Sequence, residues 1–138
     1  MVKVLTVGGG GREHAAVEAL FASGADIYAV MKSVNPGIIA RAKAHVIVNE
    51  NDRDRICDFA LEHNVEYAFI GPEGPLEAGL VDALENIGVN CAAPTKAAAR
   101  IESSKSFMRE LVSKYKIAGN LRYAAFDNAS DTERYLRS

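Results

Sequence analysis

The sequence predicts an open, doubly wound α/β domain with a mostly parallel, Rossmann-like sheet, followed by the beginning of a second domain. Strand-like segments alternate with helix-like segments up to residue 101, which is typical of a parallel sheet wrapped by helices. A glycine run at residues 8–11 joins the first strand to the first helix. Beyond residue 101 the chain offers one further strand between helices, which is too little to enclose a core of its own.

The predicted strands are short apolar runs, most of them rich in β-branched residues. We expect them at residues 2–7, 27–30, 46–48, 65–70 and 89–92. Helical periodicity and capping residues predict helices at 12–23, which Gly24 ends, and at 52–63, which Asp52 caps. A third helix is expected at 75–87 with Pro75 in its first position, where the missing N–H costs nothing. A short helix follows the NPG turn at 35–37.

The C-terminal part is predicted to contain helices at 95–101 and 103–115, a strand at 121–126 (LRYAAF) and a helix that begins at Ala129. The apolar side chains predicted to face inward from the second of these helices are Phe107, Met108, Leu111, Val112 and Tyr115. We expect the exposed part of this apolar face to associate with a second copy or a neighbouring chain.

Composition excludes several classes of protein. Sixteen basic and eighteen acidic residues give the 138-residue chain a net charge of −2, so there is no strong field to attract nucleic acid or an anionic membrane. No apolar run approaches the roughly 18 to 20 residues that span a bilayer, and no signal peptide precedes the first strand. Cys57 and Cys91 lack metal-type spacing, and we interpret both as reduced, buried residues of a cytoplasmic protein.

The glycine run predicts a ligand for backbone N–H groups, because a strand, a glycine loop and a helix N-terminus together favour an anion. The dinucleotide fingerprint GxGxxG fails in both frames, since Glu13 or His14 occupies the position of its third glycine. The second strand is followed by Lys32 and Ser33 instead of an acidic residue, which disfavours NAD, while Lys32 leaves NADP open. There is no P-loop. A glycine turn that only packs the helix is the simpler alternative.

Polar side chains surround this loop. Arg12 can bind an anion through two hydrogen bonds, and Glu13 can accept from sugar hydroxyls or simply favour the helix N-terminus. His14 is interpreted as structural. Glu73, in GPEGPL, follows the fourth strand at the same edge of the sheet, where open α/β sheets bind ligands. The alternative for Glu73 is a solvated turn carboxylate.

Taken in order, VGGGGREHA, NPG, GPEGPLEAGLVDAL and PTKAAARIESSKSFMRE resemble the phosphoribosylamine–glycine ligase (glycinamide ribonucleotide synthetase) family. The resemblance implies an ATP-grasp ligase of purine biosynthesis. Its members join phosphoribosylamine to glycine through a glycyl phosphate, with ATP and magnesium or manganese. It further implies that residues 1–101 are the substrate-side domain and that 102–138 begin the ATP-grasp domain.

The resemblance also assigns roles to residues. The loop Gly8, Gly9, Gly10 and Gly11 with Arg12 and Glu13 would approach the phosphoribosyl substrate together with Glu73, and Lys105 would reach the nucleotide phosphates. It assigns no catalytic residue and no metal ligand to this chain. Since a full member is roughly three times as long, we expect an inactive fragment that binds no cofactor tightly.

The sequence departs from the family pattern at Ala93 in CAAPTK, a minor change at a turn, and in the segment KIAGNLRY, which indicates a divergent branch. Three alternatives stay open: an NADP-binding oxidoreductase domain, a sibling ATP-grasp enzyme with a related ribonucleotide, and a non-catalytic ligand-binding module.

Overall fold

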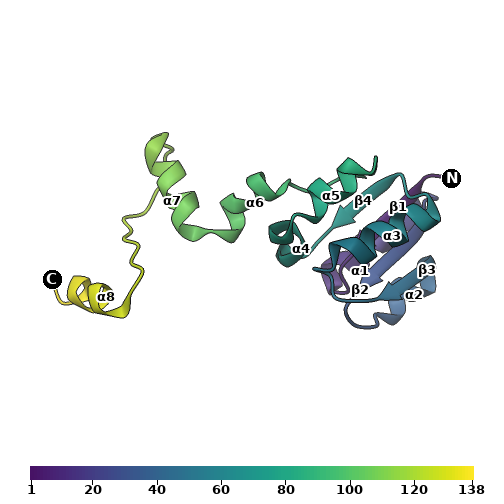
Figure 1. Ribbon diagram of the computed structural model, residues 1–138, viewed down its shortest axis with the longest axis horizontal. Helices are drawn as coiled ribbons and strands as arrows, with labels where there is room; N and C mark the ends of the chain where they lie inside the picture. Colours follow the sequence, from purple (N-terminus) through teal and green to yellow (C-terminus); the bar gives the residue numbers. More distant parts are fainter. The chain divides into compact units, whose positions relative to one another are not determined.

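The computed structural model describes residues 1–138, which form two compact units, Met1–Ser103 and Ser104–Ser138. The first unit is built on a five-stranded sheet in the order β3-β2-β1-β4-β5, in which every neighbouring pair is parallel (Figure 1). Its strands are β1 (Lys3–Val7), β2 (Asp26–Met31), β3 (Ala42–Ile47), β4 (Tyr67–Ile70) and β5 (Asn90–Cys91). The predicted doubly wound α/β class is confirmed.

Helices cover both faces of this sheet, as expected for a parallel sheet. They are α1 (Gly11–Ala22), α2 (Pro36–Arg41), α3 (Arg53–His63), α4 (Glu73–Ala78), α5 (Leu80–Asn86) and α6 (Lys96–Ser103). Successive residues of β1 belong to two different clusters: Val4 packs with Val17 of α1, while Leu5 packs with Ile56 of α3. The twofold alternation of side chains along the strand therefore divides the core between the two faces.

Local sequence signals place most helix ends where they were predicted. The Asp52 side chain accepts the Arg55 N–H at 3.2 Å and caps α3. The Asn35 side chain caps α2 in the same way, and Gly24 follows α1 with a φ of +87°. These caps satisfy backbone groups that a helix leaves without partners at its ends.

The predicted helix at 75–87 is wrong as a single element. Gly79 has a φ of +84° and separates α4 from α5, and Pro75 is the third residue of α4 instead of its first. The predicted third strand also begins too late, because β3 starts at Ala42, which pairs with Ile27 of β2. In both cases packing against the sheet decides the outcome more than local propensity does.

The second unit contains α7 (Lys105–Lys114) and α8 (Ala129–Leu136). The predicted strand at 121–126 does not form, because a strand needs a neighbouring strand to bond its backbone and this unit contains none. No residue of α7 or α8 is buried, so the apolar side chains predicted to face inward have no core to enter. The Phe126 ring lies 5.3 Å from the Tyr135 ring, measured between centroids.

Cys57 and Cys91 are free thiols as predicted, but both are half-buried where the sequence predicts buried residues. Burial raises the pKa of Cys91 to about 11 and also raises the pKa of Cys57. Removing a thiolate from water is unfavourable, so both side chains behave as small apolar groups. None of the helices is both long and apolar enough to cross a lipid bilayer.

The break at Gly79 leads to a test of the fold. Gly79→Ala is expected to lower the free energy of unfolding by about 1–2 kcal/mol, because an L-residue is strained at positive φ. The matched control is Gly11→Ala in the first turn of α1, where no atom lies within 4 Å of an added Cβ, so that its effect should stay within about 0.5 kcal/mol. Urea denaturation measures both, and an equal effect of the two substitutions would contradict the assigned backbone conformation.

Candidate functional site

The candidate site lies at the carboxyl edge of the sheet, where the loops after β1, β2, β3 and β4 meet. Backbone hydrogen bonds hold these loops in place beyond the strand ends. The Gly8 N–H donates to the Val30 carbonyl at 2.9 Å, and the Gly71 N–H donates to the Val7 carbonyl at 3.2 Å. This edge is where ligands of open α/β sheets bind.

A polar cavity of about 320 Å³ opens at this edge, within the range of small-molecule sites. It is lined by Gly9, Gly10, Arg12, Glu13, Lys32, Ser33, Val34, Glu50, Pro72 and Glu73. Five of the residues predicted to contact substrate are therefore brought together: Gly9, Gly10, Arg12, Glu13 and Glu73. Gly8 and Gly11 flank the cavity without lining it. Lys105 begins α7 in the second unit.

The glycines of this edge make room for the side chain of Glu13. An added Cβ would lie 2.7 Å from Glu13 Cγ at Gly8 and 2.6 Å from Glu13 Oε2 at Gly10, and at Gly71 it would clash with Glu13 Oε1. Gly8 also has a φ of +120°, which an L-residue rarely adopts. The space that these glycines leave beside the backbone is thus occupied by a side chain of the protein, that of Glu13.

Glu13 is buried, with 4% of its surface exposed, and both of its oxygens are hydrogen-bonded. Its Oε2 accepts the N–H of the N-cap residue Gly10 at 2.8 Å, which is one half of a capping box, since glycine has no side chain to bond in return. Its Oε1 accepts from Arg12 Nε at 3.0 Å. The capping carboxylate therefore also fixes the guanidinium of its neighbour.

Arg12 is held at the rim of the cavity in a defined orientation. Its Nη2 donates to the Gly71 carbonyl and lies 3.8 Å from Glu73 Oε1. The hydrogen bond and the charge of Glu13 raise the pKa of Arg12 further above its ordinary value, so the side chain is a permanent cation. Its remaining N–H groups, and the N–H of Gly11 in the first turn of α1, have no partner in the chain. These groups together can bind an anion.

The NPG loop is fastened to the glycine loop. The Asn35 side chain accepts the N–H groups of Gly37 and Ile38, and its Nδ2 donates to the Gly9 carbonyl at 3.0 Å. The His14 ring packs so closely on Gly37 that a Cβ there would overlap it, and His14 does not line the cavity. The loop after β2 is consequently a fixed wall of the site.

Sequence reasoning missed part of the lining. The sequence suggests Lys32 only as a partner for an NADP phosphate, and it gives no site role to Ser33, Val34, Glu50 or Pro72. Lys32 and Ser33 follow the second strand directly, which is a signal that could have placed them at the edge. Glu50 lies three residues beyond β3, and nothing in its local sequence marks it.

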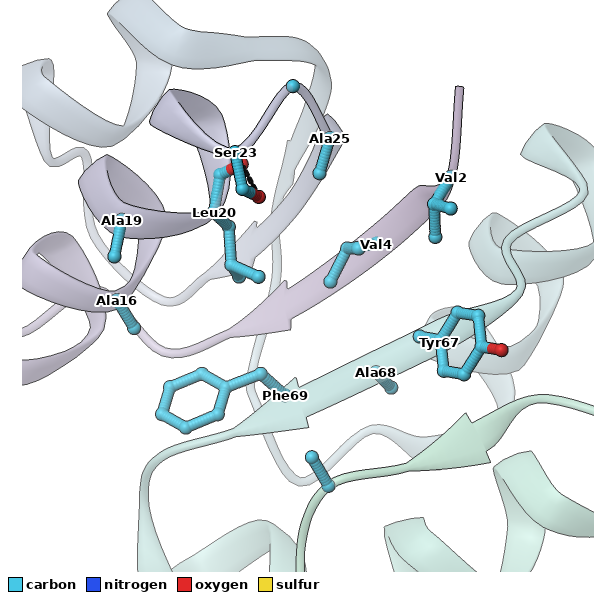
Figure 2. A pocket seen from close by; sticks show the side chains of 12 residues that line it. Val2, Val4, Ala16, Ala19, Leu20, Ser23, Ala25, Tyr67, Ala68 and Phe69 are labelled. Carbon is cyan, nitrogen blue, oxygen red and sulfur yellow. Dashed lines mark hydrogen bonds between the residues drawn. The ribbon is translucent and has the colours of Figure 1, made fainter.

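A larger hollow of about 700 Å³ lies elsewhere on the first unit (Figure 2). Its walls are Ala16, Ala19 and Leu20 of α1 on one side and Val4, Tyr67 and Phe69 of the sheet on the other, and no charged side chain lines it. It extends to the C-terminal end of α1, away from the glycine loop. Its apolar walls offer no means of recognising an anion, so the candidate site is the smaller, polar cavity.

The donor groups of the chain do not fit a metal centre. No group of three or more His, Cys, Asp or Glu side chains is placed to hold a metal ion. Two of the three acidic residues of the cavity are already engaged, because Glu13 bonds Gly10 and Arg12 and Glu73 faces Arg12. What the cavity offers is a cation held in place, backbone N–H donors and carboxylate acceptors.

A doubly wound sheet with such a cavity at its carboxyl edge defines a small-molecule-binding α/β domain. The family model "Phosphoribosylglycinamide synthetase, N domain" matches residues 2–102. The chain belongs to this family. The phosphoribosylamine–glycine ligase of Methanoregula boonei is 51% identical over 137 residues, which cover 99% of this chain and 32% of that protein. That of Pyrococcus furiosus is 46% identical over 136 residues, 99% of this chain and 31% of that protein.

The chain thus spans about a third of the length of the curated relatives it matches. Among solved structures, a phosphoribosylglycinamide synthetase from Anaerococcus prevotii superposes with a TM-score of 0.71 at 16% identity, covering 99% of this chain and 34% of that one. An N5-carboxyaminoimidazole ribonucleotide synthetase from Thermotoga maritima gives 0.77 at 17% identity, covering 98% and 36%. These structures agree with the fold described above.

The packing of Glu13 against the glycines predicts a coupled pair of substitutions. Gly71→Ala should cost about 1–3 kcal/mol of unfolding free energy, because the new methyl group and Glu13 Oε1 claim the same space. In a Glu13→Ala background the same substitution should cost less than about 0.5 kcal/mol, since the obstacle is gone. A double-mutant cycle by chemical denaturation measures the coupling, and additive effects would show that Glu13 is not what requires glycine at 71.

Proposed function

We propose that this chain is the sugar-phosphate-binding domain of a cytoplasmic, ATP-dependent carbon–nitrogen ligase. The reaction is the joining of 5-phosphoribosylamine and glycine into glycinamide ribonucleotide, with ATP hydrolysed to ADP and phosphate, a step of purine biosynthesis. The observation that carries the proposal is the Arg12 guanidinium, fixed by Glu13 and the Gly71 carbonyl at the rim of the polar cavity. Family membership over residues 2–102 supports it.

The chemistry of the cavity suits a phosphorylated sugar. Arg12 and Lys32 supply positive charge at the rim, and Lys32 forms no ion pair within the chain. Free N–H groups at the start of α1 add to the attraction for a phosphate. Glu73 faces the same space with an exposed carboxylate, which suits a hydroxyl or amine of the sugar. In this proposal Gly8 and Gly11 shape the loop, while Gly9 and Gly10 lie against the substrate.

ATP and a divalent cation belong to the proposed reaction: ATP would supply the phosphoryl group that activates the glycine carboxylate, and the cation would offset the charge of the phosphates. No step through the metal is assigned to this chain, because its residues do not fit a metal centre. Lys105, exposed at the start of α7, is proposed to reach the nucleotide phosphates. We place residues 1–101 in the substrate-side domain and 102–138 at the start of the ATP-grasp domain. The 138 residues alone are proposed to bind the amine-bearing sugar phosphate without turnover.

Isothermal titration calorimetry tests the proposed ligand. Glycinamide ribonucleotide is expected to bind the 138-residue chain, while NADPH and ATP are not expected to bind tightly. Arg12→Ala should weaken binding of the ribonucleotide by about 10- to 100-fold, because a charge-assisted hydrogen bond to the phosphate is lost. Glu73→Ala should also weaken it. Glu62→Gln, on the exposed surface of α3, is the matched control and should bind like the wild type.

Two results would contradict this assignment. Tight binding of NADPH alone, weakened by Lys32→Ala, would favour an oxidoreductase domain. Binding of the ribonucleotide that is indifferent to both Arg12→Ala and Glu73→Ala would move the site away from the polar cavity.

We also propose that the second unit mediates self-association. Its apolar side chains include Tyr115, Leu121 and Leu136, which are 64%, 66% and 77% exposed, and such surfaces commonly contact a partner. Sedimentation velocity at increasing protein concentration should show a dimer that Leu121→Asp disrupts. A chain that stays monomeric at about 100 μM would contradict this, since specific dimers commonly have dissociation constants below that concentration.

A further inference from the structure

Glu50 is a buried acidic residue without a role in the site as described so far. It is 6% exposed, and Glu13 is the only other acidic residue buried to this degree. The Glu13 carboxylate accepts two hydrogen bonds, from Gly10 and Arg12, whereas the Glu50 carboxylate accepts one. A carboxylate taken out of water needs hydrogen-bond donors to compensate its lost hydration. No fully buried side-chain oxygen of the chain lacks a partner, so an unbonded oxygen of Glu50 must still reach solvent.

One oxygen of Glu50 is bonded to the end of β2. Oε1 accepts the Lys32 backbone N–H at 3.3 Å, a long bond. The segments that follow β2 and β3 are held close together by the Val48 N–H, which donates to the Met31 carbonyl at 2.9 Å and continues the pairing of β3 with β2. The other oxygen, Oε2, has no hydrogen-bond partner in the chain, and Glu50 lines the polar cavity. The free acceptor is therefore at the cavity.

The Glu50 carboxylate lies at the end of β2, a place where related folds hold an acidic side chain. Dinucleotide-binding folds of this architecture place an acidic side chain at the end of the second strand, where it accepts from the ribose hydroxyls. Here Lys32 and Ser33 follow β2, and the sequence lacks an acid at that place. The structure supplies one from the loop after the neighbouring strand β3, because Glu50 reaches back to the backbone of Lys32.

The charge of Glu50 limits what it can bind. A carboxylate only accepts hydrogen bonds, so it complements hydroxyl or amine groups and repels a phosphate. Lys32 and Arg12 offer the cations at the same cavity, so one small site presents both an anion-binding group and an acceptor for hydroxyls. A ribose phosphate carries both complements, a phosphate and a vicinal diol.

We infer that Glu50 is a substrate-positioning residue that accepts hydrogen bonds from the vicinal ribose hydroxyls of the sugar phosphate. This inference rests on the proposed function and assigns the sugar end of the ligand to a particular side chain. Glu50 thereby makes the site selective for a ribose over a deoxygenated sugar. A purely structural role, in which Glu50 only holds the Lys32 N–H, would give no such selectivity.

The test compares glycinamide ribonucleotide with its 2′,3′-dideoxy analogue by calorimetry on the 138-residue chain. The wild type should bind the ribonucleotide about tenfold or more tightly than the analogue, the value of a hydrogen bond to a charged acceptor. In Glu50→Gln this preference should fall to within about twofold, since the acceptor loses its charge. The amide oxygen can still accept the Lys32 N–H, so the fold is retained, and Glu62→Gln serves as the matched control.

Each outcome separates the inference from the proposed function. If the wild type binds both ligands equally, or if Glu50→Gln keeps the wild-type preference, the inference is overturned and the proposed function stands. If the wild type binds neither ligand, the proposed function fails and the inference fails with it. Equal binding of the two ligands by the wild type would overturn the inference even if the variant does not fold.

Discussion

The buried carboxylate of Glu13 is the contact on which the candidate site depends. It caps α1 through the Gly10 N–H and orients Arg12, and it fills the space that glycine leaves at three positions. Side chains at those positions would displace it, and the helix would lose its cap and the guanidinium its support. In the proposed site the glycine run would therefore act on a ligand indirectly, by admitting the side chain that holds Arg12 in place.

The parallel sheet brings segments that are distant in the sequence together at one site. Because all five strands run in the same direction, the loops that follow β1, β2, β3 and β4 emerge at one edge. Backbone bonds beyond the strand ends and the Asn35 side chain fasten these loops to one another. The cavity is thus preformed by the main chain, which lowers the entropy lost when a small ligand binds.

Much of the fold could be predicted from local patterns, and part of the site could not. The glycine run, the caps at Asp52 and Gly24 and the acid at Glu73 each act within a few residues, so the sequence indicates them directly. Gly79 divides into two helices an amphipathic stretch whose sequence pattern predicts one. The strand predicted at 121–126 does not form because no neighbouring strand is present to bond its backbone. Glu50 joins the site only through the pairing of β3 with β2, a contact that no local pattern encodes.

The most direct measurement is a map of backbone amide chemical shifts of the ¹⁵N-labelled chain during titration with glycinamide ribonucleotide. If the polar cavity binds the sugar phosphate, the largest changes should cluster at the amides of Gly9, Gly11, Lys32 and Glu73. Those of Leu20 and Phe69, in the apolar hollow of Figure 2, should hardly move. Changes centred on the apolar hollow, or none at a saturating concentration, would contradict a sugar-phosphate site at the carboxyl edge of this sheet.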